Sequence, residues 1–529
     1  NLNNLSVAQE TLPTKSGFTD NSLRSALARI QYDFDDRFVL NLSARYDGSS
    51  RFADGYKWGF FPSAGLAWKV SNEDFLSTSN TISDLRLKVS YGETGNTAIG
   101  SYRSLPQTTT ASYILNGNEL GIGVAIGNLV VEGLTWETTS QIDTGLSLGL
   151  FQDRIAIEAD YYKKETTNLL LDQPVPATTG FDTVFTNVGT LVNEGLEFVV
   201  NTKNIENDNF SWSSSFNISF NDNEVTDLGG AEEFFTKAIG DNQISLDYVT
   251  RVGEPVGNIF GLEVDGVYTY ADFIDFDGLT DAEASAKIAQ DALDQAKSYQ
   301  QLEYQLKDGV VISAGRTDTS TYRPGLPKLK DQITVDTDGD GIPDSGDGIV
   351  NSDDRTIIGR TVPKHFGGFT NNFTYKNFDL SILTSWSYGN EVYNKNLVRG
   401  LNQTIPFFNK YGSIRDRWTP DNPNSSIPTV NGFGDAGVSG NSYSHFVEDG
   451  SFIRLSNITL GFKLPKRVIK TLGVKSFRLY AAADNIWLWS DYSGYDPEVS
   501  VGNNQLTPGL DSDSYPRART FRVGLNVGF

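Results

Sequence analysis

Strict alternation of apolar and polar residues marks the end of the chain. In residues 520–529, the apolar side chains of Phe521, Val523, Leu525, Val527 and Phe529 occupy every second position. Successive side chains of a β-strand point to opposite faces, so this segment is predicted to be a strand with one apolar and one polar face. A soluble β-sandwich and an outer-membrane barrel both contain such strands, but in the barrel the apolar face meets lipid. The pattern along the rest of the chain is needed to distinguish the sandwich from the barrel.

The same alternation recurs along all 529 residues. Ile142, Leu146 and Leu150 alternate with small or polar residues, and a second run beginning at Ile155 follows a tight turn at 152–153. Small and polar residues opposite an apolar stripe suit a water-filled lumen better than a packed core. Counting such runs predicts about thirteen strands, at 22–33, 38–46, 59–69, 85–92, 138–150, 154–163, 191–203, 210–221, 364–374, 378–389, 451–463, 476–487 and 519–529.

Connection lengths favour the barrel. Short connections lie near 35–36, 152–153, 205–209 and 375–377, with somewhat longer ones at 70–84 and 463–475. They alternate with long loops at 47–59, 93–135, 165–190, 221–363, 389–450 and 490–519. Bacterial outer-membrane barrels have short periplasmic turns and long outside loops, whereas a sandwich has no reason to sort its loops in this way. We therefore predict an all-β, transmembrane antiparallel barrel with long extracellular loops.

The predicted strand count is odd, whereas bacterial single-chain barrels have even numbers of strands and both termini in the periplasm. We therefore expect residues 1–529 to be the C-terminal portion of a larger barrel that begins in an outside loop. Residues 222–363 would be a long extracellular insertion, and the N-terminal strands would lie outside this sequence.

Composition narrows the function classes. Lys and Arg number 43 and Asp and Glu 66, giving a net charge of −23, and mean hydropathy is −0.33. The acidic excess disfavours nucleic acid as a partner, because phosphate binding needs clustered Lys and Arg. The chain contains no cysteine, which excludes disulfides, thiolate metal sites and cysteine nucleophiles. No apolar run approaches the roughly 20 residues of a membrane-spanning helix.

Several motifs carry a family resemblance. They are 87–96 (LKVSYGETGN) with 99–102 (IGSY), 134–138 (LTWET), 187–189 (NVG) with 193–197 (NEGLE), 338–341 (DGDG) with 353–359 (DDRTIIG), 367–380 (GGFTNNFTYKNFDL) and 515–517 (YPR). Together they span nearly the whole chain. The sequence resembles the barrel of SusC/RagA-type TonB-dependent outer-membrane transporters of Bacteroidota.

This resemblance implies a barrel of about 22 strands, of which this chain would hold the C-terminal thirteen. The plug domain and TonB box of the family have no counterpart in the sequence. The implied function is active import of oligosaccharides or peptides at the outer membrane. The implied partners are a SusD-like lid lipoprotein and, through the N-terminal region, TonB–ExbB–ExbD; a dimer of transporter–lid pairs is also compatible with the family.

Other function classes stay open at this stage. One is a passive porin or structural barrel without a plug, which the residues preceding Asn1 would distinguish from an active importer. The other is a secreted carbohydrate-binding β-protein, which would be soluble without detergent. His365 and His445 have no partner motif, so no enzymatic activity is expected.

An acidic segment gives a candidate metal site. Carboxylates at relative positions 1, 3, 5, 9 and 12, with glycine at 6 and a backbone carbonyl at 7, match an EF-hand-type Ca²⁺ loop. These ligands would be Asp336, Asp338, Asp340, Ile342, Asp344 and Asp347, with Asn351 and Asp353 as further candidates. Position 12 is Asp rather than Glu, and no flanking helices are predicted. A solvated acidic turn is the alternative, and in either case the segment would order an outside loop.

Aromatic residues form two groups. Trp58, Phe60, Phe61, Trp487 and Trp489 adjoin predicted strands and are interpreted as an interfacial girdle. The second group lies deeper within a long loop, where stacking on a sugar, contact with a peptide or lid partner, and packing within the loop all remain open. Its members are Tyr393, Phe407, Phe408, Tyr411 and Trp418. Segment 280–307 is predicted to contain a small helix that packs within its loop.

Overall fold

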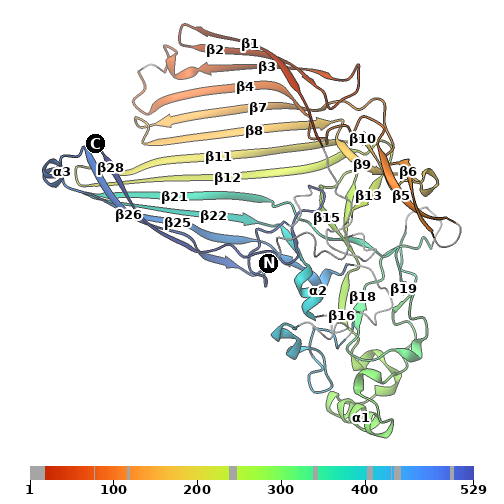
Figure 1. Cartoon of the computed structure of the whole chain (residues 1–529). Coiled ribbons are helices and arrows are strands. Elements are labelled where there is room, and N and C mark those ends of the chain that lie inside the picture. Colours follow the sequence, from red (N-terminus) through yellow and green to blue (C-terminus); the bar gives the residue numbers. More distant parts are fainter. Residues whose placement is uncertain are drawn as a thin grey trace, which may run out of the picture. The chain divides into compact units, whose positions relative to one another are not determined.

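The computed structural model describes residues 18–76, 78–115, 119–236, 247–337, 343–401, 409–430, 432–433, 442–500 and 505–529. Thirteen strands form one sheet in the order β1-β2-β3-β4-β7-β8-β11-β12-β21-β22-β25-β26-β28 (Figure 1). Their bounds are β1 Leu23–Phe34, β2 Phe38–Ser49, β3 Trp58–Lys69, β4 Ile82–Asn96, β7 Glu137–Leu150, β8 Ile155–Thr167, β11 Thr190–Glu206, β12 Phe210–Asp227, β21 His365–Tyr375, β22 Phe378–Tyr388, β25 Phe452–Lys463, β26 Ser476–Ser490 and β28 Thr520–Gly528.

All thirteen predicted strands are confirmed, and they follow one another in the sheet in chain order. Several are longer than the sequence indicated: β12 continues to Asp227 and β4 begins at Ile82. The added residues are largely polar, so they extend the backbone ladder without the apolar alternation that reveals a strand. Phe34 of β1 pairs with Phe38 of β2 across a three-residue connection, in which Asp35 and Asp36 have φ values of 54° and 52°, the positive values that tight hairpin turns favour.

Cross-strand pairing places like residues on the same face. Phe378 pairs with Phe462 and Leu380 pairs with Leu460 on the apolar face. On the polar face of β22 and β26, Arg478 donates a 3.0 Å hydrogen bond from Nε to Asp379. The sheet therefore separates an apolar face from a face carrying ion pairs, as a barrel wall between lipid and lumen requires.

A β-bulge interrupts β25. Against β22, Leu383 and Thr384 pair with Asn457 and Leu455, which makes Ser456 an extra residue of β25. Against β26, Leu455 and Asn457 pair with Trp487 and Asp484, so two β26 residues lie opposite Ser456. Ile453 and Leu455 precede the bulge, and Ile458 and Leu460 follow it. All four lie on the apolar face, where their partners on β22 and β26 are apolar except for Thr384, which pairs with Leu455. The bulge thus changes the sequence positions that face lipid from odd to even.

The long connections contain smaller elements. Their strands are β5 Thr108–Leu115, β6 Glu119–Ile126, β9 Leu170–Pro174, β10 Thr183–Asn187, β13 Glu233–Thr236, β14 Tyr248–Arg251, β15 Asn258–Gly261, β16 Val264–Val267, β17 Ile312–Ser313, β18 Pro327–Leu329, β19 Ile349–Val350, β20 Thr356–Gly359, β23 Glu391–Asn394, β24 Val447–Asp449 and β27 Leu510–Asp511. Two helices lie in the long connections, α1 Asp281–Asp294 and α2 Lys395–Leu401, and α3 Lys466–Leu472 lies in the shorter connection between β25 and β26.

Two compact units divide the chain. The first comprises the described parts of Asn1–Ala67, Val89–Ile142 and Lys164–Thr190; the second comprises Trp68–Lys88, Asp143–Lys163 and Leu191–Phe529. The first unit has a small loop core around Trp136, Phe52 and Phe61.

The assignment of Phe61 to the interfacial girdle was wrong. Phe61 is only 7% exposed, and its ring lies on the face of the strand opposite Trp58 and Phe60, close to Gly59 and Gly95.

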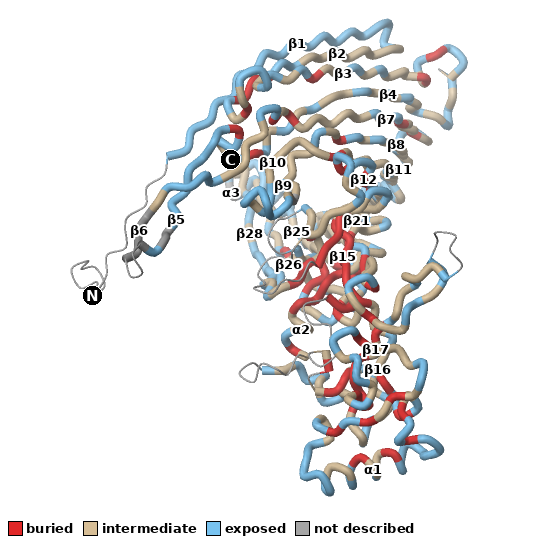
Figure 2. Tube along the Cα trace, turned by 90° about the vertical axis from the view of Figure 1, so that its right-hand side faces the viewer, coloured by how far each residue is buried: buried red, intermediate tan, exposed pale blue. Residues whose placement is uncertain are grey.

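The second unit holds two larger cores, both in its loops. One surrounds α1 and includes Trp418, Tyr304 and Ile288, which confirms the predicted packing of this helix within its loop. The other contains Tyr248, Ile259 and Tyr393. Figure 2 shows buried residues gathered around β15 and β17, while the strands of the large sheet are mostly intermediate or exposed. Hydrophobic burial therefore organises the loops rather than the wall.

Among the described residues, the helices all fall short of the length and apolar character needed to cross a membrane.

Candidate functional site

Three long loops of the second unit meet around Asp247. The Nζ of Lys395 lies 3.7 Å from Asp247, and both side chains are at most 8% exposed. Ser442 donates a hydrogen bond to the same carboxylate. The adjacent Tyr248 donates a 3.0 Å hydrogen bond to the carbonyl of Pro508. Because buried charges are costly unless paired, these contacts bind loops 221–363, 389–450 and 490–519 into one assembly.

Tyr411 lies on this assembly beside α2. A Cβ on Gly400 would overlap the Tyr411 ring. Because glycine has no side chain, the ring can pack directly against α2. Arg399 of α2 forms an ion pair with Asp513, and the backbone N–H of Asp513 donates to Asn396 at 2.8 Å. The ring nevertheless stays 45% exposed. Desolvation raises the pKa of the Tyr411 phenol, with further contributions from Tyr495, Asp511 and Asp513.

The last long loop supplies the neighbours of Tyr411. Tyr492 is buried and donates a 2.6 Å hydrogen bond to Asp511; desolvation raises its pKa, and this hydrogen bond raises it further. Three residues later, Tyr495 is 76% exposed. Tyr411 therefore presents an accessible ring near the exposed Tyr495 and the carboxylates of Asp511 and Asp513.

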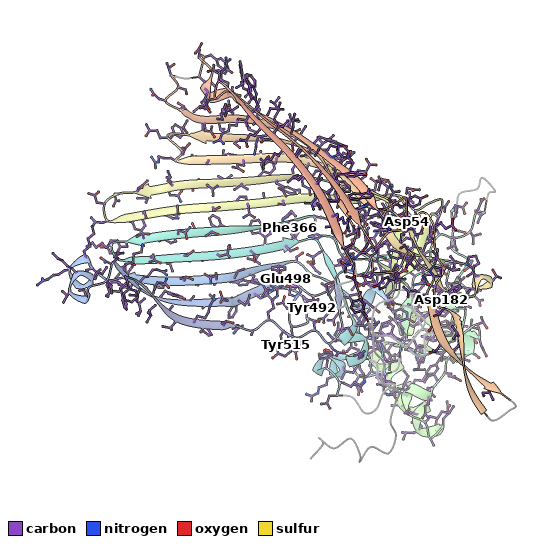
Figure 3. All side chains as sticks on the ribbon, turned by 45° about the horizontal axis from the view of Figure 1, so that its top comes forward. Asp54, Asp182, Phe366, Tyr492, Glu498 and Tyr515 are labelled. Carbon is purple, nitrogen blue, oxygen red and sulfur yellow. The ribbon has the colours of Figure 1, made fainter. Side chains whose placement is uncertain are left out.

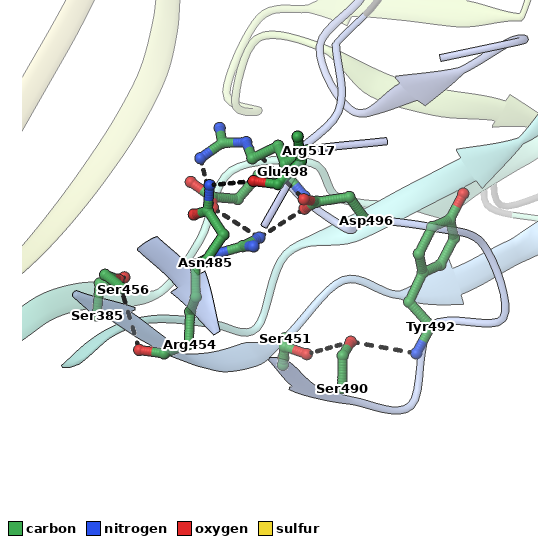
Figure 4. A network of polar contacts seen from close by, with 11 residues as sticks. Ser385, Ser451, Arg454, Ser456, Asn485, Ser490, Tyr492, Asp496, Glu498 and Arg517 are labelled. Atoms are coloured by element: carbon green, nitrogen blue, oxygen red, sulfur yellow. Dashed lines mark hydrogen bonds and ion pairs between the residues drawn. The ribbon is translucent and has the colours of Figure 1, made fainter. Parts of the chain in front are cut away.

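An ion network holds this loop against β25 (Figure 4). Arg454 is 4% exposed and contacts Asp496 at 2.7 Å and Glu498 at 2.9 Å. Arg517 lies 3.1 Å from Glu498. Two cations thus balance two carboxylates: Arg454 attaches the first half of loop 490–519 to β25, and Arg517 joins the two halves of the loop. Tyr492, Glu498 and Tyr515 of this loop are labelled in Figure 3.

The predicted aromatic residues separate in the structure. Trp418 and Tyr393 are 1% and 3% exposed and belong to the two loop cores, which supports the interpretation that both pack within the loops. Phe407 and Phe408 lie outside the described residues. Tyr411 alone of the set is described and exposed. Sequence reasoning missed Tyr495, because no pattern connects residues more than eighty positions apart.

The arrangement suits binding rather than covalent chemistry. Tyrosine rings offer flat apolar faces with a polar tip, and aspartates accept hydrogen bonds from ligand hydroxyl or amide groups. The two histidines are engaged elsewhere. His365 accepts a 3.3 Å hydrogen bond from Trp386 Nε1, and the ring of His445 packs 5.4 Å from that of Phe433.

The base of the predicted Ca²⁺ loop is a narrow hairpin. Val335 and Ser345 form an antiparallel bridge, and the Thr337 hydroxyl donates a 2.7 Å hydrogen bond to Asp344. Asp347 accepts from the backbone N–H of Ile349 at 2.7 Å. Asp338, Asp340 and Ile342 lie outside the described residues. Among the described residues, including Asp336, no group of three or more acidic, histidine or cysteine side chains is arranged to hold a metal ion.

Two further carboxylates adjoin this hairpin. Asp354 is 1% exposed and accepts 2.8 Å hydrogen bonds from the backbone N–H groups of Gln332 and Asn351. Desolvation raises the pKa of Asp354, and Asp331 raises it further. Asp331 lies before the twelve-residue spacing pattern and Asp354 after it, so the spacing alone did not reveal them.

Comparison with known proteins places the chain in a family. The family model for the TonB dependent receptor-like β-barrel matches residues 3–486. TonB-dependent receptor P26 of Formosa agariphila is 34% identical over 535 residues, covering 100% of this chain and 48% of the relative. TonB-dependent receptor SusC of Bacteroides thetaiotaomicron is 29% identical, covering 97% of this chain and 44% of the relative.

A solved structure has the same fold. The RagAB peptide transporter structure superposes with a TM-score of 0.74 at 24% identity, covering 100% of this chain and 50% of that chain. This chain thus spans about half the length of the curated relatives it matches. The family match, the thirteen-stranded wall and its packed loops lead to one conclusion: the chain belongs to the TonB-dependent receptor β-barrel family of the outer membrane.

Proposed function

We propose that this chain is part of an active importer that carries oligosaccharides or peptides across the outer membrane, with energy from TonB–ExbB–ExbD and a SusD-like lipoprotein as its lid. The observation that carries this proposal is the combination of the receptor barrel with large loops packed into a defined surface. A passive pore needs no such surface, whereas capture of a large solute does.

The relatives support this function. SusC is named a TonB-dependent receptor, and the RagAB structure is described as a peptide transporter. The SusC sequence aligns with 97% of this chain, and the RagAB structure shares its fold over the whole chain. The substrate of this chain is therefore expected to be one of the two classes, oligosaccharide or peptide, captured at the long-loop end.

Within that surface, Tyr411 and Tyr495 with Asp511 and Asp513 form the proposed contact with substrate. Both rings are exposed, and the residues beneath them are fixed by the Arg399–Asp513 ion pair and the Tyr492–Asp511 hydrogen bond. Fixed rings lose little conformational entropy on binding a ligand, which favours affinity.

The acidic hairpin is proposed to bind Ca²⁺ as a structural ion. Its carboxylate spacing supports this assignment, as does the narrow base closed by Val335 and Ser345. The proposed ligands remain those of the sequence pattern, and the ion would order the loop without taking part in transport chemistry.

Uptake by cells carrying the complete transporter gene tests the import function. A deletion strain complemented with the gene should accumulate a labelled oligosaccharide mixture or a labelled peptide mixture, and a protonophore should abolish that uptake. Uptake that persists with the protonophore would indicate a passive pore. Affinity purification of the tagged transporter should also recover an outer-membrane lipoprotein in equal amount, and its absence would contradict the proposed lid.

A further inference from the structure

A groove opens at the long-loop ends of β21, β22, β25 and β26. It has a volume of about 530 Å³, within the range of pockets that hold small molecules. The described residues that line it include His365, Trp386, Ile453 and Trp489 of the strands and Asp449 and Asp491 beyond them. None of these residues belongs to the proposed substrate surface.

Three directly paired residues give the groove its shape. Trp386 pairs with Ile453, and Ile453 pairs with Trp489, so all three lie side by side on the apolar face. Ile453 and Trp489 are each 53% exposed. The shorter isoleucine between two indoles leaves a slot with an apolar floor and aromatic walls.

The position of Trp386 widens this slot. Its ring covers Gly367 of β21, where a Cβ would lie 2.5 Å from Trp386 Cζ2, and it stacks on Phe216 of β12 at 5.5 Å. Its Nε1–H donates to His365. The indole is therefore held toward β21 and β12, on the side away from β25, which leaves the space above Ile453 open.

The groove is polar beyond the strand ends. Asp449 and Asp491 are exposed there, and the lining residues described include neither lysine nor arginine. The rim is fixed, because the Ser490 hydroxyl donates to the Ser451 carbonyl at 2.8 Å and the Tyr492 N–H donates to Ser490 at 3.2 Å (Figure 4). An apolar slot thus leads into an acidic rim.

We propose that this groove binds a lipid of the outer leaflet, with an acyl chain in the slot between Trp386 and Trp489 and a headgroup at Asp449 and Asp491. The apolar face of a barrel wall contacts lipid, and the groove continues that face to its outer edge. The two carboxylates select a headgroup that presents hydroxyl or amine donors. This proposal concerns the membrane-facing surface and does not depend on the import substrate.

Native mass spectrometry of the complete transporter, purified from its own outer membrane in mild detergent, tests the site. Ile453→Trp fills the slot and should lower the number of retained lipid molecules severalfold. Leu460→Trp is the matched control, because Leu460 is 50% exposed on the same face of the same strand but does not line the groove; it should retain lipid as the parent does.

A second variant probes the headgroup without altering the slot. Asp449→Asn combined with Asp491→Asn should weaken lipid retention and shift the retained lipids away from species with amine-bearing headgroups. Equal retention in the parent, Ile453→Trp and the double variant would overturn the proposal. A change in the number of transporter copies per particle with unchanged lipid content would also overturn it, because the groove would then be a protein interface.

Discussion

Arg454 and Asp496 form a buried ion pair of 2.7 Å between a strand of the barrel wall and the last long loop, with side chains only 5% and 6% exposed. Breaking a buried pair by removing one partner leaves an uncompensated charge, at a cost of about 3–5 kcal/mol. The pair therefore helps to hold the part of the last long loop around Asp496 against β25, and with it the neighbouring Tyr495.

Substitution Arg454→Met should release this loop while the barrel remains folded. Hydrogen exchange in residues 490–500 should accelerate strongly, because the local free energy of opening falls. Arg522→Met provides the control: Arg522 pairs with Asp484 at 2.6 Å but is 59% exposed, and exposed pairs contribute about 0.2–1 kcal/mol. Equal exchange in the two variants would show that the Arg454 network does not hold the loop.

Removing the exposed rings should weaken substrate capture. Tyr411→Ala and Tyr495→Ala are each expected to cost about 0.5–1.5 kcal/mol of ring contact, or roughly two- to tenfold in the concentration for half-maximal uptake. Tyr375→Ala, at the short-turn end and 54% exposed, should leave uptake unchanged. An effect of Tyr375→Ala as large as those of the loop variants would remove Tyr411 and Tyr495 from the proposed site.

Acidification should loosen the loop that carries His445. Burial lowers the pKa of this imidazole from its ordinary value of 6.5, so the folded loop holds His445 neutral where the unfolded chain would protonate it. Stability from the neutral ring is complete above about pH 6.5 and declines as pH falls below that value, because the unfolded state then binds more protons.

Hydrogen exchange in residues 442–449 measures this effect. Exchange should accelerate between pH 6.5 and 5 relative to pH-corrected reference rates, and His445→Phe, which cannot titrate, should flatten that dependence. A pH dependence that persists in His445→Phe would assign it to another group.

Calcium should bind the acidic hairpin. Calorimetric titration of the chelator-treated complete transporter should show a site that is lost when Asp338→Ala and Asp340→Ala are combined. Because the ion is proposed to order only the loop, heat-modifiable migration of the barrel should not change in chelator. Identical titrations of the parent and the double variant would leave the solvated acidic turn as the correct interpretation.

Cysteine labelling tests the orientation of the barrel, since the chain has no native cysteine. Gln152→Cys lies in the turn between β7 and β8, whereas Tyr515→Cys lies in the last long loop at a position 92% exposed. An impermeant maleimide added to whole cells should label position 515 and spare position 152. The reverse result would place the long loops in the periplasm.

The sequence predicted the wall well because lipid and lumen impose a two-residue repeat that each strand carries by itself. Strand β28 shows this repeat without interruption from Thr520 onward. Prediction was weaker where the repeat is absent: the polar extension of β12 and the short strands of the loops were not expected. Burial of Trp418 against Tyr270 depends on contact between different loops, which local patterns do not encode.

The bulge at Ser456 bears on how relatives should be compared. At this level β25 holds one residue more than β22, and β26 holds one residue more than β25, yet the apolar side chains before and after the bulge still lie on the same face of the sheet. Two homologues whose strands differ in length by one residue can accordingly build the same wall. A single-residue gap in an alignment across this strand is then a structural marker of the bulge position rather than a sign of misalignment or of a lost strand.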